Sequence, residues 1–526
     1  MDNIKANQLD PNDPLLSNES TDTQSSSSNI SLIDQSTNDM DMQKKKEDDD
    51  ENQRFTQHSP LVSLLIFSIG PLSNVASLLF ETISMFFITK RFGETKGTYA
   101  IEILGFSQQY QSFLTIIGMF FGQVFITRMG SLIGSGQREA AIHLTSDIFR
   151  LIIISTIIYS IPMFFVIKPF LKFVGTPDYM IEPAFKYNFV LLCFSLFSNL
   201  LSSEQSFIYS IGRPILSAII CVVYKGIQCL ALDPLFLFLC KVPTMIMKLS
   251  KIVIDIGFSI ALFVTIFAGK FSLKPTMKMF LSFKFSKETL KSLLFPIPFT
   301  FAFATSLFPP MIILKALTDS AKQSGQSQSI GGAFAVYSQL NGLGSAIPSM
   351  LTTSLMATGM HAYSSGNIKR LKHLLFWSFV IAMTFSILFS LSMILFKVPI
   401  ASLFIHDEEE LQIAAKMLPI PFYTSSLSGF DTIAMALLMI IGKPLLVMIP
   451  TILSPCNLII SCFILKKIFK DDYIKLMYSY NISGIISLLI YIGMFIYAIK
   501  VILKTEKEKD HLTSANPITE NLLAEN

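Results

Sequence analysis

Four carboxylates stand inside long apolar segments and have no basic residue three or four positions away: Glu81, Glu204, Asp233 and Asp431. An ionisable side chain inside a membrane span costs roughly 2.5–3.5 kcal/mol on insertion scales, so such a residue is usually functional or paired. In this setting a carboxylate can take up a proton, hold a cation or attract a cationic ligand, because little water surrounds it. These residues are the first candidates for chemistry in the chain.

Other charged residues in apolar segments have spacings that indicate ion pairs. Asp147 and Arg150 are three positions apart, and Lys251 and Asp255 are four apart, which places each pair on one helix face. The spacings of the six cysteines match neither a zinc site nor a disulfide framework. We therefore expect no metal site.

The composition decides which elements must hold these residues. The chain has 526 residues, of which 51% are hydrophobic and 15% are charged, with 47 Phe and one Trp. Runs of about 20 apolar residues recur along it, and each is long enough to cross a bilayer as a helix. This pattern indicates an all-α polytopic membrane protein. It excludes a soluble enzyme, a secreted disulfide scaffold and a DNA-binding protein.

We predict twelve transmembrane helices. The even count places both tails on one side of the membrane, and the excess of Lys and Arg in the loops favours the cytoplasm. That excess depends strongly on residues 270–291, which contain six lysines and resemble a basic amphipathic segment on the inner leaflet. The predicted spans are 60–88, 99–128, 140–167, 184–211, 214–239, 248–269, 290–317, 331–359, 374–397, 410–440, 443–465 and 475–502.

The amino-terminal tail differs in charge from the rest of the chain. Residues 1–59 carry 13 acidic and 5 basic side chains with few apolar ones, a composition typical of disorder. No hydrophobic stretch precedes residue 60, so we expect no cleavable signal peptide. The predicted organisation is a disordered acidic cytoplasmic tail (1–59), an N-terminal six-helix lobe (60–269), a basic amphipathic cytoplasmic linker (270–289), a C-terminal six-helix lobe (290–503) and a cytoplasmic tail (504–526).

An internal repeat sets the expected architecture. SGQREAAIHL (135–144) aligns with SGNIKRLKHL (365–374), and IGRPILSAI (211–219) aligns with IGKPLLVMI (441–449), and both matches have the same offset along the chain. Six spans separate the copies, and a repeat with an even number of spans keeps its orientation. The sequence therefore predicts two parallel six-helix repeats around a central cleft, which is typical of transporters that rock between two states.

The repeat also relates two of the four carboxylates. Glu204 lies eight residues before Gly212, and Asp431 lies eleven residues before the equivalent Gly442. The difference of three residues is nearly one helical turn, so the two side chains could project from similar faces. Two acidic groups in a central cavity would suit a cationic substrate. The alternative for Asp431 is a hydrogen bond to a neighbouring helix.

Several motifs resemble the multidrug and toxic compound extrusion (MATE) transporter family, over about residues 60–503. GSLIGSGQREAA (130–141) is similar to the family's Gly-rich loop after the second span, and LALDPLFLF (230–238) to its Asp-Pro motif in the fifth. The G-[RK]-P turns follow the fourth and tenth spans, as in the family. The loop after span two does not match the major facilitator class, and the chain has no phosphate-binding G-x-x-x-x-G-K-[ST] motif.

The resemblance implies roles for three of the carboxylates. It places Glu81 and Asp233 at the acidic positions of the family's amino-terminal cation site, and Asp431 on the central cavity. Cys229 stands where the family commonly has Asn, and thiol is a poor ligand for Na⁺, which favours H⁺ as the coupling ion. Lys225 could instead neutralise one carboxylate as a fixed counter-ion, in which case Asp233 would be structural, and the alternative for Glu81 is a carboxylate that extends to the membrane interface. The family's acidic residue in span seven has no counterpart here.

The polar stretch YSQLNGLGS (337–345) is a further candidate cavity lining, through Tyr337, Gln339 and Asn341. The alternative for this stretch is helix–helix packing through its small residues.

These observations predict a secondary active antiporter that exports organic cations or xenobiotics by rocking-type alternating access, driven by H⁺ or, second, by Na⁺. We expect no enzymatic activity and no cofactor besides the coupling ion. The expected partners are a small organic cation and the lipid bilayer, without nucleic acid, and the chain is expected to be a monomer. Its membrane is the plasma membrane or an internal acidic compartment. The alternatives are a lipid-linked precursor flippase of the wider superfamily and a non-transporting membrane receptor.

Overall fold

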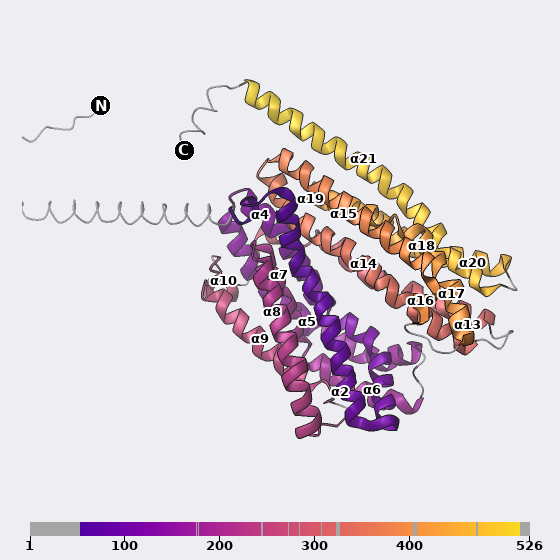
Figure 1. The fold of residues 1–526 in the computed structure, drawn as a ribbon. Coiled ribbons are helices and arrows are strands. Elements are labelled where there is room, and N and C mark those ends of the chain that lie inside the picture. Colours follow the sequence, from indigo (N-terminus) through magenta and orange to yellow (C-terminus); the bar gives the residue numbers. More distant parts are fainter. Residues whose placement is uncertain are drawn as a thin grey trace, which may run out of the picture. The chain divides into compact units, whose positions relative to one another are not determined.

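The computed structural model describes residues 53–515, with gaps at 175, 177, 244–245, 272, 283, 307, 322–326, 403–407 and 470–471. Within these residues the chain is helical and has no strand (Figure 1). The interactions below lie in the compact unit Arg54–Asn526. Most of the predicted acidic tail, residues 1–52, lies outside the described part of the chain.

The first half of the described chain runs from α2 to α9. Two of its helices, α2 and α8, begin at Pro60 and Pro214, where the missing N–H is no loss because first-turn amides have no partner within the helix. The elements are α2 (Pro60–Leu114), α3 (Ile116–Val124), η1 (Phe125–Met129), α4 (Gly130–Gly134), α5 (Arg138–Val174), α6 (Asp178–Cys193), α7 (Ser195–Ser210), α8 (Pro214–Gly226), η2 (Ile227–Leu232), η3 (Leu235–Leu239) and α9 (Leu249–Phe267).

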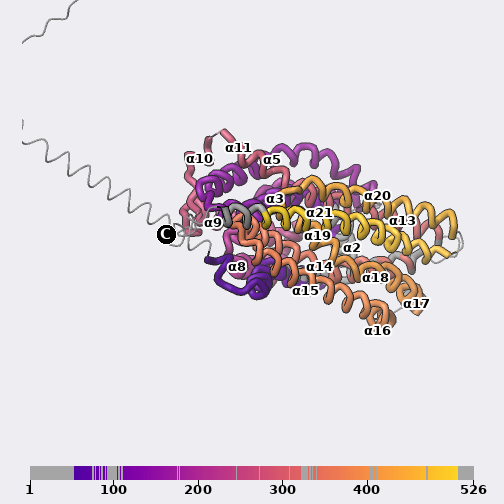
Figure 2. The backbone as a smooth tube through the Cα atoms, turned by 90° about the horizontal axis from the view of Figure 1, so that it is seen from above, coloured from indigo at the N-terminus to yellow at the C-terminus, as the bar shows by residue number. Residues whose placement is uncertain are grey.

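Two short helices, α10 (Met277–Leu281) and α11 (Lys287–Ser292), form the linker to the second half, and both lie beside α5 (Figure 2). The second half comprises α12 (Ile297–Ser306), α13 (Phe308–Ala321), α14 (Ser327–Ser364), α15 (Ile368–Leu395), α16 (Lys397–Ser402), α17 (Glu408–Met417), α18 (Pro419–Ser425), α19 (Ser428–Ile440), α20 (Pro444–Ile468), η6 (Tyr473–Met477) and α21 (Tyr478–Ala515).

The helices account for the predicted spans except at one boundary: α2 continues through the predicted loop 89–98, and the predicted span 99–128 is divided between α2 and the candidate span Ile116–Gly134. Eight helices of the described residues are long and apolar enough to cross a membrane, or ten when each of two bent pairs counts as one span. The two remaining predicted spans, 60–88 and 331–359, fall within α2 and α14. The predicted all-α polytopic fold is confirmed.

The repeat predicted from the sequence is visible in the backbone. Gly136 and Gly366 have φ of +70° and +72°, and Gly212 and Gly442 have φ of +81° and +74°. Each glycine follows the end of a helix and has a left-handed backbone conformation, which residues with a Cβ rarely adopt. The hydrogen bonds also match, since Gly212 N–H donates to the Tyr209 carbonyl at 3.2 Å and Gly442 N–H to the Met439 carbonyl at 3.0 Å.

The two bent spans occupy equivalent places in the repeat. The fourth predicted span breaks between α6 and α7 with a bend of 53°, and the tenth breaks before α19 with a bend of 40°. Phe194 at the first break and Thr424 near the second are related by the offset of the repeat. Glu204 and Asp431 both lie after the break in their span.

Comparing Gly212 with its repeat equivalent Gly442 tests the close contacts around Gly212. An added Cβ at Gly212 would lie 3.0 Å from Arg54 Cβ and 3.2 Å from the Phe55 ring, whereas at Gly442 no atom lies within 4 Å. We expect Gly442→Ala to cost only the left-handed strain of about 1–2 kcal/mol. Gly212→Ala should cost more, measured as the midpoint of thermal unfolding in detergent. Equal losses in the two variants would contradict the close contact with Arg54 and Phe55.

The buried apolar side chains form three clusters that differ in which half supplies them. One cluster lies within the first half and includes Tyr110 and Tyr187, and a second lies within the second half and includes Tyr337 and Phe422. The third contains residues of both halves. We call this third set the shared cluster, and its helices are joined by the turns at 135–137, 211–213, 365–367 and 441–443.

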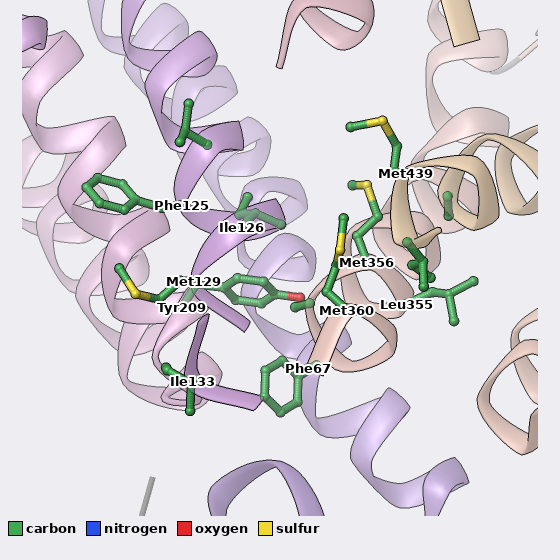
Figure 3. Close-up of a cluster of buried hydrophobic side chains, with 14 of the residues drawn as sticks. Phe67, Phe125, Ile126, Met129, Ile133, Tyr209, Leu355, Met356, Met360 and Met439 are labelled. Atoms are coloured by element: carbon green, nitrogen blue, oxygen red, sulfur yellow. The ribbon is translucent and has the colours of Figure 1, made fainter. Parts of the chain in front are cut away.

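Side chains of the two halves face one another in the shared cluster (Figure 3). Phe67, Met129 and Tyr209 of the first half lie opposite Met356 and Met360 of the second. The backbones also approach closely. Ser354 Oγ of α14 donates a hydrogen bond of 2.7 Å to the Leu64 carbonyl of α2, and a Cβ on Gly130 would lie 2.7 Å from the Ala357 carbonyl oxygen. The predicted orientation puts this end of the molecule at the cytoplasm.

Candidate functional site

Glu81, one of the four candidate carboxylates, has a basic partner in the structure. Its Oε1 lies 3.1 Å from the Nζ of Lys225, so α2 and α8 are joined by an ion pair. The Lys225 side chain is 11% exposed and the Glu81 side chain 52%. A largely buried lysine without this carboxylate would be an uncompensated charge, which is costly. The counter-ion that the sequence left open for Lys225 is thus Glu81.

Asp233 lies where the regular α-helical ladder is interrupted. The π-helical turns η2 and η3 flank it on either side, and Pro234 removes one backbone donor. The side chain is 1% exposed, its Oδ1 accepts a hydrogen bond from Ser250 Oγ, and its Oδ2 is buried without a partner among the described residues. Asp233 and Glu81 therefore have separate partners and share no hydrogen bond that the described structure shows.

A second lysine, Lys248, belongs to the same region and was not identified from the sequence. Its Nζ donates a hydrogen bond of 3.2 Å to Ser84 Oγ, and it lies within electrostatic range of Asp233 and Glu81. Together with Lys225 it balances the charge of the two carboxylates. The sequence signal was weak, because Lys248 stands at the predicted beginning of a span, where a lysine can extend to the interface.

No lysine or arginine of the described residues balances the charge of Glu204 in this way. Glu204 lies on α7, is fully buried, and neither of its carboxylate oxygens has a hydrogen-bond partner among the described residues. The residues one helical turn away on either side, Leu200, Leu201 and Ile208, are buried and apolar. An unpaired carboxylate in such surroundings is costly in its charged form. It is stable there when it carries a proton or meets a cation.

Asp431 of the second half is in a similar situation. It lies in the first turn of α19, directly after the bend, and its Oδ1 is buried without a hydrogen-bond partner among the described residues. Gly429, two residues earlier, allows a close approach to α15, because a Cβ there would lie 2.7 Å from the Ala382 carbonyl oxygen. Tyr491 of α21 is within electrostatic range of the carboxylate. The fixed packing of α19 holds Asp431 in place.

The three predicted cavity residues on α14 are in different surroundings. Tyr337 is buried, and its ring centroid lies 6.1 Å from that of Phe422 and 5.2 Å from that of Tyr480, in the apolar cluster of the second half. Asn341 is exposed. The side chain of Gln339 lies outside the described part of the structure. Tyr337 therefore packs between helices through its ring, whereas the alternative considered above was packing through the small residues of the stretch.

A polar cavity of about 230 Å³ lies among α2, α3, α7, α8 and α14. Its lining includes no Asp, Glu, Lys or Arg, but Gln123 Oε1 is buried and has no hydrogen-bond partner among the described residues. Such an atom requires water or a ligand. One signal was available in the sequence, since Ser202, Gln205, Ser206 and Tyr209 recur at helical spacing within an apolar span.

Phe55, which precedes the first predicted span, lies between the two halves. Its side chain is 1% exposed, and its ring stacks on His361 of α14 with centroids 4.5 Å apart, while Phe67 of α2 lies 5.3 Å away. Arg370 of α15 donates a hydrogen bond of 2.6 Å to the Phe55 carbonyl and one of 2.8 Å to Ser63 Oγ. No feature of the sequence singled out this segment, because Phe55 was counted with the acidic tail.

His361 should make this contact sensitive to acid. Burial, with the Arg370 charge nearby, lowers the pKa of His361 from 6.5 to about 4. In the unfolded chain the imidazole titrates near 6.5, so between pH 6.5 and 4 the unfolded state binds the extra proton. We expect the wild type to lose up to about 3 kcal/mol of stability as the pH falls through this range, and nothing above pH 7.5.

The measurement is the thermal unfolding midpoint of the wild type and His361→Asn from pH 8 to pH 5. The difference between the two should change with pH, whereas His373→Asn, a change at an exposed histidine, should follow the wild type. A pH-independent difference would contradict the titration of His361.

Among the described residues, no group of three or more His, Cys, Asp or Glu side chains could hold a metal ion.

The sequence profile of the MatE family matches residues 74–231 and 324–463. No curated protein matches the chain. A MOP superfamily transporter from Pyrococcus furiosus, described as having a binding pocket of reverse polarity, is similar in structure, with a TM-score of 0.74 at 17% identity, covering 86% of this chain and 98% of that one.

Two further solved structures share the fold. One is an outward-facing multidrug resistance MATE family transporter of the MOP superfamily, with a TM-score of 0.72 at 16% identity, covering 86% of this chain and 98% of that one. The other is a substituted form of a Vibrio cholerae MATE transporter, also with a TM-score of 0.72 at 16% identity, covering 87% and 98%.

Proposed function

We propose that this chain, which belongs to the MatE family of multi-pass membrane transporters, is a secondary active antiporter that exports organic cations in exchange for protons. The family membership establishes transport. The coupling ion, the substrate class and the direction are our proposal.

The observation that carries the proposal is the contrast among the four carboxylates. Glu81 has Lys225, and Asp233 has Ser250 with Lys248 nearby, although Asp233 Oδ2 is also buried without a partner in the described part of the chain. Glu204 and Asp431 have neither a hydrogen bond nor an ion pair among the described residues, and both have buried oxygens without partners. A buried unpaired carboxylate must be neutralised by a proton or a cation. Competition between the two at one carboxylate is the exchange that an antiporter requires, so we place the coupling on Glu204 and Asp431 rather than on Glu81 and Asp233.

The surroundings of these carboxylates favour H⁺ over Na⁺. A bound Na⁺ needs several oxygen ligands, as hard cations do. Around Glu204 the residues one turn away are Leu200, Leu201 and Ile208, and no described hydrogen-bonding group reaches its oxygens. Cys229 near Asp233 donates to the Phe80 carbonyl at 3.1 Å and offers a sulfur where an oxygen would be needed. A proton needs no such ligands.

An organic cation suits the same features. Carboxylates attract a cation strongly where water is scarce, and the uncharged polar cavity beside α7 supplies hydrogen-bonding groups without a competing positive charge. One solved structure of similar fold is described as a multidrug resistance transporter, and another is described as having a pocket of reverse polarity that suggests a different function. The charge of the groups near the cavity is therefore the property to test.

Rocking of the two halves would supply alternating access. The halves share one apolar cluster at the predicted cytoplasmic end, whereas the other two clusters each belong to one half. Breaking the shared cluster would leave both of the others intact, which is the behaviour expected of two rigid bodies. We place both tails in the cytoplasm and the protein in the plasma membrane or in the membrane of an internal acidic compartment.

The test is uptake of a fluorescent organic cation into vesicles that contain the purified full-length protein. We expect uptake when the vesicle interior is acidic, collapse of uptake when a protonophore removes the pH gradient, and no dependence on Na⁺. Protein-free vesicles give the background. Uptake that follows a Na⁺ gradient at constant pH would overturn proton coupling, and no flux of any of several cations under either gradient would overturn the substrate class.

A further inference from the structure

We infer that the linker between the halves and the beginning of α5 form a binding site for the phosphate-bearing headgroup of an anionic membrane lipid. The site is a pocket of about 370 Å³ whose lining includes His143 of α5 and Lys278, Ser282 and Lys284 of the linker. Figure 2 shows α10 and α11 beside α5. This inference does not rest on the proposed substrate or coupling ion.

The pocket has a rigid wall because the linker is fastened to α5. Asp147 pairs with Arg150 at 2.6 Å, and its Oδ2 accepts hydrogen bonds from Ser286 N–H at 3.0 Å and from Thr289 Oγ1 at 2.8 Å. Arg150 donates to the Lys284 carbonyl at 3.1 Å. These bonds hold the backbone that carries Lys284. The ion pair predicted from the spacing of Asp147 and Arg150 is confirmed.

Arg150 also extends the basic character of this region. Its guanidinium lies 4.1 Å from the centroid of the Phe285 ring, which lines the pocket. Two of its nitrogens, Nε and Nη1, are buried without hydrogen-bond partners among the described residues. Arg150 therefore offsets the one acidic residue of the lining, Asp147. The lysines are left in excess, and a phosphate group is the ligand that such a set of donors recognises.

Exposed apolar side chains beside the pocket indicate that the phosphate belongs to a lipid. Met277 and Leu281 of α10 are 55% and 72% exposed, on either side of Lys278 in the chain. An apolar pair on a short basic helix is typical of a segment that enters the boundary between headgroups and acyl chains. Together the lysines and the apolar pair fit a headgroup in the pocket with its acyl chains beside α10.

The predicted orientation places the linker on the cytoplasmic leaflet, where anionic lipids are concentrated. Each Lys near such a surface contributes about 1 kcal/mol of attraction. A pocket adds to this general attraction a preference for headgroups with more than one phosphate, because the two lysines of its lining can contact separate phosphates. The expected ligand class is therefore a phosphorylated inositol lipid rather than any single-charged lipid.

The experiment titrates detergent-solubilised full-length protein with dioctanoyl phosphatidylinositol bisphosphate and counts bound lipid by native mass spectrometry. We expect saturable binding of one molecule, and at least a tenfold weaker affinity in the double variant Lys278→Gln/Lys284→Gln. The matched control is Lys270→Gln/Lys274→Gln, which removes the same charge from the same linker outside the pocket lining and should change affinity by less than twofold. Unfolding midpoints without lipid show whether each variant is folded.

Further arms identify the source of the phosphate. Inositol trisphosphate and inorganic phosphate should compete only at much higher concentrations, because they lack acyl chains. Competition by inositol trisphosphate at the same concentration as the lipid would overturn a lipid in favour of a soluble anion. Equal losses in the pocket and control double variants would overturn the pocket itself and leave only the general charge of the linker.

Discussion

Asp431→Asn is expected to abolish proton-driven uptake of organic cations, and Glu204→Gln should reduce it at least tenfold. Both substitutions keep the shape of the side chain and remove its ability to exchange a proton. Each carboxylate has buried oxygens without partners among the described residues, so the neutral amide should fold at least as well as the wild type. The measurement is the initial rate of gradient-driven uptake in vesicles that contain matched amounts of protein.

The control for these variants is Glu182→Gln, which removes a carboxylate of the same predicted lobe as Glu204. Glu182 pairs with Lys168 at 2.9 Å, and both side chains are about half exposed, so this pair contributes little to stability. Its removal should leave uptake unchanged. Normal uptake in Asp431→Asn would contradict the assignment. Loss of uptake only in Glu81→Gln would instead place the coupling site at Glu81 and Asp233, the amino-terminal cation site that the family resemblance implies.

The sequence predicted the elements well because their cause is local. Each span needs about 20 apolar residues, and each helix end at 136, 212, 366 and 442 needs a glycine in a left-handed conformation. Each requirement can be recognised in a short stretch of the sequence. The constant offset of the repeat could therefore be found from short matches, and the backbone angles at the paired glycines agree with it.

The partners of the candidate carboxylates could not be predicted in the same way. Glu81 and Lys225 are far apart in the chain, and the sequence showed only that Lys225 lies two turns before Asp233. Which carboxylate the lysine reaches depends on how α2 packs on α8, and no local pattern specifies that packing. The lack of a partner for Glu204 among the described residues could not be predicted either, because it depends on which side chains the neighbouring helices place near its carboxylate.

The contact of Phe55 with both halves was hidden by composition. Residues 1–59 are acidic and polar as a whole, so the mean hydropathy of this segment does not reveal a single buried phenylalanine. A single aromatic residue placed between two lobes can nevertheless have a large energetic effect, because its ring is fully buried.

Phe55→Ala is expected to shift the protein towards states in which the two halves separate at the shared cluster. Removing a fully buried phenylalanine ring costs about 3–5 kcal/mol. The ring contacts His361 of the second half and Phe67 of the first, so the part of this cost that belongs to the contact with His361 falls only on states in which the halves meet there. If that part is about half of the cost, the equilibrium between the two kinds of state would change by a factor of about 10 or more.

Spin labels can measure this shift. Ser135 and Ser365 are exposed, equivalent in the repeat and located at the turns of the shared cluster, one in each half. In a cysteine-free background, labels at both positions should give a longer distance in a larger fraction of molecules when Phe55 is replaced by Ala. Phe173→Ala, which removes an exposed ring of α5, should leave the distribution unchanged.

Arg370→Gln provides a second route to the same result. It removes the hydrogen bonds that hold the Phe55 and His58 carbonyls without changing the apolar packing, and we expect a smaller shift in the same direction. If both variants unfold at lower temperature but keep the wild-type distance distribution, the segment stabilises each half separately. If the distances lengthen, the residues before the first span take part in closing the transporter. Anything that displaces them would then open its cytoplasmic side.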